Sequence, residues 1–94
     1  MEYRFEWDNL KAESNLKKHG ISFHEAYTVF FDGLARIFDD AEHSVGENRE
    51  LIFGYSNKNR LLIVSFTQRG DIIRIISARK VTKLERKRYE EYKK

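Results

Sequence analysis

The stretch Ile72–Lys80, which reads Ile-Ile-Arg-Ile-Ile-Ser-Ala-Arg-Lys, constrains the fold more than any other part of the chain. Its β-branched residues are interleaved with cations, a pattern that favours a β-strand. Successive side chains of a strand point to opposite faces, which predicts Ile73, Ile75, Ser77 and Arg79 on one face and Ile72, Arg74, Ile76, Ala78 and Lys80 on the other. A strand that is apolar on both faces is normally covered on both. We therefore predict that this is the central strand, with Arg74 and Arg79 at an edge or in a cleft.

The length of 94 residues corresponds to one domain, residues 1–94, which can bury a modest core. The chain has no cysteine, which excludes disulfides, thiolate metal sites and a cysteine nucleophile. No apolar run approaches the roughly 18 residues of a membrane span, and the N-terminus lacks the apolar region of a signal peptide. We expect a cytoplasmic protein with no membrane partner.

The charge of the chain is distributed unevenly along its length. Residues 1–48 contain five Lys/Arg and ten Asp/Glu, whereas residues 49–94 contain thirteen and five. Such an asymmetry points to a polyanionic partner. A solvated basic helix at the C-terminus would explain part of the excess, but it does not account for arginines within predicted strands.

The remaining pattern predicts eight elements in the order β-α-α-β-β-β-β-α. Asp8 fits a helix N-cap, and Gly20 fits the left-handed position that ends a helix. Two pairs have capping-box spacing: Ser22 with Glu25, and Thr82 with Glu85. The predicted strands are 3–7, 34–38, 51–55, 61–67 and 72–80, and the predicted helices are 9–18, 22 to about 31, and 82 to about 92. This order predicts an α+β domain whose central antiparallel sheet packs against two N-terminal helices and a C-terminal helix.

Two short groups of residues suggest proton chemistry. Lys18 and His19 close the first predicted helix, and a histidine titrates near neutrality, as a proton-transfer group requires. Cations at a helix C-terminus are also favourable by about 0.3–1 kcal/mol through the helix dipole alone. Glu47 and Arg49, before the third predicted strand, could be a general base beside a phosphate clamp. They could equally form a surface ion pair worth about 0–1 kcal/mol.

A third, mainly cationic group follows the strand at 72–80 into the last helix: Arg74, Ser77, Arg79 and Lys80, then Lys83, Arg86 and Lys87. Guanidinium groups bind phosphate oxygens in a bidentate manner and keep their charge at every relevant pH. The alternative is that Arg74 and Arg79 pair with the acidic loop at 39–48 or with Glu85. No two histidines have a zinc spacing and the acidic loop lacks a calcium-binding pattern, so neither a metal site nor a cofactor is predicted.

Motifs in a recognisable order run through nearly the whole chain: Phe5-Glu-Trp-Asp8, Lys11 with Asn15, Lys18-His-Gly20, Phe23-His-Glu-Ala26, Glu47-Asn-Arg49, Gly54 and Arg74-Ile-Ile-Ser-Ala-Arg79. Together they resemble the BrnT family, the toxin half of the BrnT/BrnA type II toxin–antitoxin system. The resemblance implies a RelE-like fold and an endoribonuclease activity that inhibits translation. It also implies a BrnA-like ribbon-helix-helix antitoxin as partner, with RNA as substrate and operator DNA bound through the antitoxin complex.

Carried onto this chain, the resemblance marks the matching positions as active-site candidates. We predict metal-independent RNA cleavage in which the catalytic residues are His19, Glu47, Arg49 and Arg79, and the RNA phosphates are bound by Lys18, Arg74, Lys80, Lys83 and Arg86. His19 or Glu47 would transfer protons, and an Arg79→Ala variant would lose toxicity while keeping its fold. The alternative function is a non-catalytic basic module that binds nucleic acid or a partner and acts in transcriptional autoregulation.

Overall fold

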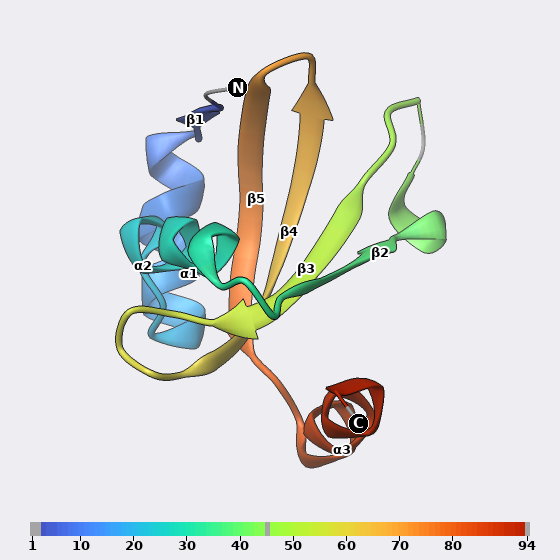
Figure 1. Cartoon of the computed structure of the whole chain (residues 1–94). Coiled ribbons are helices and arrows are strands. Elements are labelled where there is room, and N and C mark those ends of the chain that lie inside the picture. Colours follow the sequence, from blue (N-terminus) through green and yellow to red (C-terminus); the bar gives the residue numbers. More distant parts are fainter. Residues whose placement is uncertain (1–2, 45, 94) are drawn as a thin grey trace.

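The computed structural model describes residues 3–44 and 46–93, and its elements follow the predicted order (Figure 1). Strand β1 (Arg4–Glu6) is followed by helices α1 (Asn9–His19) and α2 (Phe23–Thr28), and then by the 3-10 turn η1 (Val29–Phe31). The rest of the domain comprises β2 (Arg36–Asp39), the 3-10 turn η2 (Ala41–His43), β3 (Glu50–Tyr55), β4 (Leu61–Arg69), β5 (Ile72–Lys80) and α3 (Lys83–Lys93). The predicted α+β class is confirmed.

The five strands form one sheet in the order β1-β5-β4-β3-β2. Strands β2 to β5 pair antiparallel, as the predicted meander requires, but β1 pairs parallel with β5. Two predictions are therefore wrong: β4 rather than β5 is the middle strand, and the sheet is mixed rather than wholly antiparallel. The physical reason is that β1 fills the free edge of β5, and a strand far away in sequence can do so in either direction because no tight turn links the two.

Local capping residues set the ends of α1 and the start of α3. The Asp8 carboxylate accepts hydrogen bonds from two amides of the first turn of α1, and Gly20, with a φ of 71°, ends that helix. Thr82 and Glu85 form the predicted reciprocal box, with distances of 3.2 Å from the Glu85 amide to Thr82 Oγ1 and 2.8 Å from the Thr82 amide to Glu85 Oε1. No helix among the described residues is long and apolar enough to cross a membrane.

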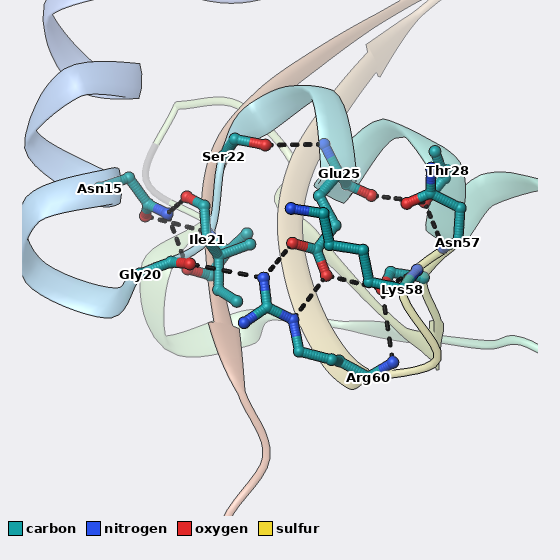
Figure 2. Close-up of polar contacts among 11 residues, drawn as sticks. Asn15, Gly20, Ile21, Ser22, Glu25, Thr28, Asn57, Lys58 and Arg60 are labelled. Atoms are coloured by element: carbon teal, nitrogen blue, oxygen red, sulfur yellow. Dashed lines mark hydrogen bonds and ion pairs between the residues drawn. The ribbon is translucent and has the colours of Figure 1, made fainter.

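The other predicted capping box, at the start of α2, is only half formed. Ser22 Oγ accepts from the Glu25 amide at 3.0 Å, but the Glu25 carboxylate turns towards the β3–β4 hairpin instead of towards Ser22 (Figure 2). There it accepts from Ser56 Oγ at 2.6 Å and from Arg60 Nε at 2.9 Å, and it forms an ion pair with the same guanidinium. The hydrogen bond from Arg60 lowers the pKa of Glu25 although the side chain is buried. This buried pair clamps α2 to the hairpin.

One face of the sheet is covered by α1 and α2, whereas the other carries only α3 at one end. The core lies under the first two helices and includes Ile21, Phe23, Ala26, Val29, Ile52, Leu62, Val64, Phe66, Ile73 and Ile75. Helix α3 lies apart from α1 and α2, beyond the end of β5 (Figure 1). It is anchored by Tyr89, which is 2% exposed and donates to the Leu34 carbonyl oxygen at 3.2 Å. On the rest of this second face, which we call the open face, Arg74 and Ser77 of β5 are exposed, whereas Ser65 and Thr67 of β4 are buried.

A β-bulge in β5 decides which side chains reach the open face. The β4–β5 register shifts between residues 65 and 66 of β4, and Ile76 has no residue opposite it. A bulge moves the alternation of side chains by one residue. On one side of the bulge Arg74 lies opposite Thr67, and on the other side Ser77 and Arg79 lie opposite Ser65 and Ile63, all on the open face. The predicted faces are therefore wrong from Ser77 onwards, because the arginines share a face that strict alternation would divide.

The Asn15 side chain supports β5 beyond the bulge, where β1 no longer reaches. Its Nδ2 atom donates to the carbonyl oxygens of Ala78 at 2.8 Å and Ile21 at 3.0 Å, while its Oδ1 atom accepts from the Ala78 amide at 3.1 Å. A buried side-chain amide thus replaces the missing strand neighbour. It also fixes α1 against the strand that carries Arg74 and Arg79.

Gly54 of β3 lies where η1 and the residues before β2 pass closest to the sheet. A Cβ atom here would lie 2.9 Å from Ala35 Cβ and 3.0 Å from Val29 Cγ1, so the backbone would have to move. We predict that Gly54→Ala lowers the free energy of unfolding by about 1–3 kcal/mol, measured by urea denaturation. Gly33→Ala is the control, because its Cβ would meet open space. An unchanged midpoint for Gly54→Ala would contradict the tight packing.

Candidate active site

Two adjoining hollows, of about 360 and 400 Å³, lie on the open face. Both are bordered by Glu42, His43 and Arg49, so we treat them together as the open-face site. Their floor is made by side chains of the two longest strands: Ser65 and Thr67 of β4, and Arg74, Ser77 and Arg79 of β5. The site is thus built on the rigid centre of the sheet.

Three of the predicted arginines meet in this site. Arg49 directly precedes β3, whereas Arg74 and Arg79 come from β5, where the bulge directs both towards the open face. Lys11 of α1 borders the same site. Cations gathered from three elements around one hollow are suited to binding an anion such as a phosphate group.

The three arginines differ in whether they already form an ion pair with a carboxylate of the protein. Arg74 Nη1 lies 2.6 Å from Glu6 Oε2, and both side chains are about half exposed. The alternative that Arg74 pairs with the acidic loop is thus wrong, because its partner lies on β1. Arg49 has no ion-pair partner among residues 3–44 and 46–93. Its charge is therefore the most available of the three for a bound anion.

Arg79 is held by Glu85 through two parallel hydrogen bonds, of 2.8 Å from Nη1 to Oε1 and 2.9 Å from Nη2 to Oε2. The Arg79 guanidinium lowers the pKa of Glu85 to about 2, and the carboxylate in turn raises the pKa of Arg79. Because the pKa of Glu85 is lowered, the Arg79–Glu85 pair contributes fully to the stability of the fold above the ordinary carboxyl pKa of 4.5. This contribution is lost as the pH falls towards 2. The alternative that Arg79 pairs with Glu85 is confirmed. Since this pair also joins α3 to β5, we expect Arg79→Ala to disturb the attachment of α3 as well as the site.

The loop between β2 and β3 closes through its own hydrogen bonds. The Asp40 amide donates to the Arg49 carbonyl oxygen at 2.9 Å. Ser44 Oγ donates to the Asp40 carbonyl oxygen at 2.6 Å and accepts from the Arg49 amide at 2.9 Å. The loop thereby brings His43 to the border of both hollows, beside Arg49.

The family of the chain follows from comparison with known proteins. A family model described as "Ribonuclease toxin, BrnT, of type II toxin-antitoxin system" matches residues 7–85. The chain belongs to the BrnT family. No curated protein matches the chain. Among solved structures, the crystal structure of the Brucella abortus ribonuclease toxin BrnT matches with a TM-score of 0.66 and 23% sequence identity, covering 86% of this chain and 99% of that one. At this identity the match shows a shared fold, and the resemblance seen in the motifs is confirmed.

Several residues predicted from the BrnT resemblance do not border the open-face site. Lys18 and His19 lie in the last turn of α1, Lys80 ends β5, and Lys83 and Arg86 lie on α3. None of these five lines either hollow. Glu47 does border the site, but its Oε1 atom accepts from Arg69 Nε at 2.6 Å. The alternative that Glu47 forms an ion pair with Arg49 is therefore wrong, because its partner is Arg69 of β4.

Four titratable residues of the open-face site were not predicted in this BrnT-family chain: Lys11, Asp40, Glu42 and His43. Lys11 lies four residues before Asn15 on α1, a spacing that places both on the helix face that meets β5. Asp40 and His43 are three residues apart in a stretch that its composition marks only as an acidic loop. Within the described ranges, no group of three or more His, Cys, Asp or Glu residues is placed to hold a metal ion.

Proposed function

We propose that this BrnT-family chain is an endoribonuclease that cleaves RNA without a metal ion, through attack of the substrate's own 2′-hydroxyl on the adjacent phosphorus. The observation that carries the proposal is the meeting of Arg49, Arg74 and Arg79 on one face of the sheet. Guanidinium groups match the geometry of phosphate oxygens, and they stabilise the additional charge of a pentavalent phosphorus centre.

The reaction needs a base that accepts the proton of the 2′-hydroxyl, positive charge beside the non-bridging oxygens, and an acid that protonates the departing 5′-oxygen. Arg49 supplies the most available positive charge, because Arg74 and Arg79 each keep a carboxylate partner on the open face or its border. Arg79 spends three of its five N–H donors on Glu85 and on the Lys80 carbonyl oxygen, which leaves two for a phosphate. Lys11 adds a third positive charge to the hollow that Arg49 and Arg74 border.

The cellular role that we propose is that of a cytoplasmic toxin that inhibits translation by cleaving RNA. We propose a BrnA-like ribbon-helix-helix antitoxin as its partner, which would also bring the complex to operator DNA. The exposed, cationic character of the open-face site supports this pairing, because an acidic antitoxin segment lying there would exclude RNA. Antitoxin and RNA are then expected to compete for this one surface.

A second function, the binding of nucleic acid or a partner without catalysis, is favoured by the surface of α3. Lys83, Arg86, Lys87 and Arg88 are all exposed on this helix, outside the two hollows. A basic helix of this kind binds polyanions without needing a catalytic site. This function predicts affinity that weakens steeply with salt and no change in the bound RNA.

The deciding experiment is incubation of the purified chain with total bacterial RNA in excess EDTA, and separately with a translating extract in its own buffer. We expect new fragments that end in a 2′,3′-cyclic phosphate or a 3′-phosphate, identified by gel electrophoresis and phosphatase treatment. Salt-sensitive binding with intact RNA in both assays would contradict the nuclease and support the binding module.

A further inference from the structure

We propose that His43 is the proton-transfer residue of the open-face site and that Asp40 is its positioning residue. The inference rests on the proposed function and names a group that the motifs did not mark. It is carried by the placement of an imidazole, already held on one side by a carboxylate, at the border of the hollow that contains Arg49.

The pair has the geometry of a histidine that is oriented by a carboxylate. His43 Nδ1 lies 3.0 Å from each of the two carboxylate oxygens of Asp40. A carboxylate only accepts hydrogen bonds, so Nδ1 must carry the proton and the Nε2 atom of the neutral ring keeps its lone pair. No hydrogen-bond partner of Nε2 is found in the part of the chain that the structure describes. The free nitrogen is thus available to a substrate hydroxyl.

The surroundings restrain the carboxylate and leave the ring accessible. The Asp40 side chain is 14% exposed, whereas that of His43 is 61% exposed. The Asp40 backbone is fixed at both of its polar groups, by Arg49 through its amide and by Ser44 through its carbonyl oxygen. A largely buried carboxylate that orients an exposed imidazole is the arrangement expected where the imidazole exchanges a proton with a bound substrate.

The charged groups around the imidazole come from several elements. Asp40 and Glu42 belong to its own loop, Arg49 lies at the start of β3, Arg74 and Arg79 project from β5, and Lys11 projects from α1. The cations favour a phosphate in the hollow, and that phosphate would lie beside the imidazole. Of the acidic residues of this loop, Asp40 holds the ring and Glu47, which also lines one hollow, pairs with Arg69 of β4; none forms an ion pair with Arg74 or Arg79 among the described residues.

The proposed step is balanced in atoms and protons. The lone pair of His43 Nε2 takes the proton of the 2′-hydroxyl as O2′ forms a bond to phosphorus, and Asp40 stabilises the resulting imidazolium. The bond from phosphorus to O5′ then breaks, and the imidazolium returns the same proton to the departing 5′-oxygen. The products are a 2′,3′-cyclic phosphate and a 5′-hydroxyl, with no net gain or loss of protons and no further reactant.

The structure favours His43 over the two proton-transfer candidates that the motifs suggested. His19 lies in the last turn of α1 and lines neither hollow. Glu47 borders one hollow, but its carboxylate is engaged with Arg69 at 2.6 Å. His43 borders both hollows, and its Nε2 atom has no hydrogen-bond partner among the described residues.

The test compares His43→Gln with two matched controls, His19→Gln and His24→Gln, in the cleavage assays above. His24 packs edge-on against Trp7 on the helical side and serves as a histidine outside the site. We expect His43→Gln to cleave at least about 100-fold more slowly, with the two controls close to wild type. Binding of a 2′-O-methylated RNA, which cannot react, should stay unchanged in all three variants. Added imidazole should restore part of the activity of His43→Ala, which a merely structural role would not allow.

The positioning role of Asp40 has its own readout. Asp40→Asn should lower kcat with little change in KM, and it should have no additional effect in a chain that already carries His43→Ala. Full cleavage by His43→Gln, or loss of cleavage in His19→Gln alone, would overturn the inference and leave the proposed nuclease standing. A wild-type chain that cleaves neither free RNA nor RNA in the extract would overturn the nuclease, and the inference with it.

Discussion

Replacing Arg49 with Ala is expected to reduce the rate of RNA cleavage at least about 100-fold, the loss typical of removing one group that stabilises developing charge. Arg49 borders both hollows of the open-face site, and its guanidinium has no ion-pair partner in residues 3–44 and 46–93. Binding of a 2′-O-methylated RNA should weaken less than catalysis does, because the transition state carries more negative charge than the bound substrate. Initial rates and equilibrium binding on the same RNA measure the two effects separately.

Two further variants give this prediction its controls. Arg49→Lys keeps the charge but not the planar fork, so we expect an intermediate loss of cleavage. Arg4→Ala removes an arginine at the opposite edge of the sheet, whose side chain is 72% exposed and lies 3.8 Å from Asp71. It should leave cleavage unchanged. Equal losses in Arg4→Ala and Arg49→Ala would show that only overall charge matters, as the binding module predicts.

Arg49 is a cleaner probe of the site than Arg79, although both were predicted from the same motifs. Arg79 is tied to Glu85 by two hydrogen bonds, and the same carboxylate accepts from the Thr82 amide at the start of α3. Removing Arg79 would therefore remove a contact that holds α3 as well as the proposed phosphate contact. A loss of activity in that variant would have two explanations, whereas a loss in Arg49→Ala has one.

The features that the sequence predicted correctly depend on residues close together in the chain. Asp8 and Gly20 define the ends of α1 through contacts within a single turn of the backbone. The box of Thr82 and Glu85 formed because Glu85 can reach the Thr82 amide and Arg79 at the same time. The box of Ser22 and Glu25 is only half formed because Arg60, 35 residues away, binds the Glu25 carboxylate. A capping pattern therefore predicts the contact correctly only where no charged residue from a distant part of the chain binds the same side chain.

The parts of the site that sequence reasoning missed depend on longer-range geometry. The sequence does not show that Ile76 is the residue without a partner in β4. The bulge at Ile76 nevertheless places Arg74 and Arg79 on one face of the sheet. The types of residue that bind phosphate were predictable, but their common face was not. The spacing of three residues between Asp40 and His43 could be read from the sequence. Their place in the site could not, because it depends on the hydrogen bonds of Ser44 that close the loop.

Removing the buried carboxylate of Glu25 is expected to have the largest effect on stability. The Glu25 side chain is 1% exposed and holds Ser56 and Arg60 of the hairpin against α2. Glu25→Ala should lower the free energy of unfolding by about 3 kcal/mol, towards the lower end of the range for breaking a buried ion pair. The lower end applies because the Arg60 side chain is 30% exposed and can be partly hydrated once its partner is gone. Urea denaturation at neutral pH measures the change.

The pH dependence of this effect and a surface control make the prediction specific. Since Arg60 lowers the pKa of Glu25, the pair contributes fully above the ordinary carboxyl value of 4.5 and loses its contribution as the pH falls through the lowered pKa. The stability difference between wild type and Glu25→Gln should therefore shrink on acidification. Asp71→Asn, which breaks the exposed contact with Arg4, should change stability by no more than about 1 kcal/mol. The difference in free energy of unfolding between wild type and Glu25→Gln could instead stay constant down to strongly acid pH. In that case packing, and not the charge of Glu25, would hold α2 to the hairpin.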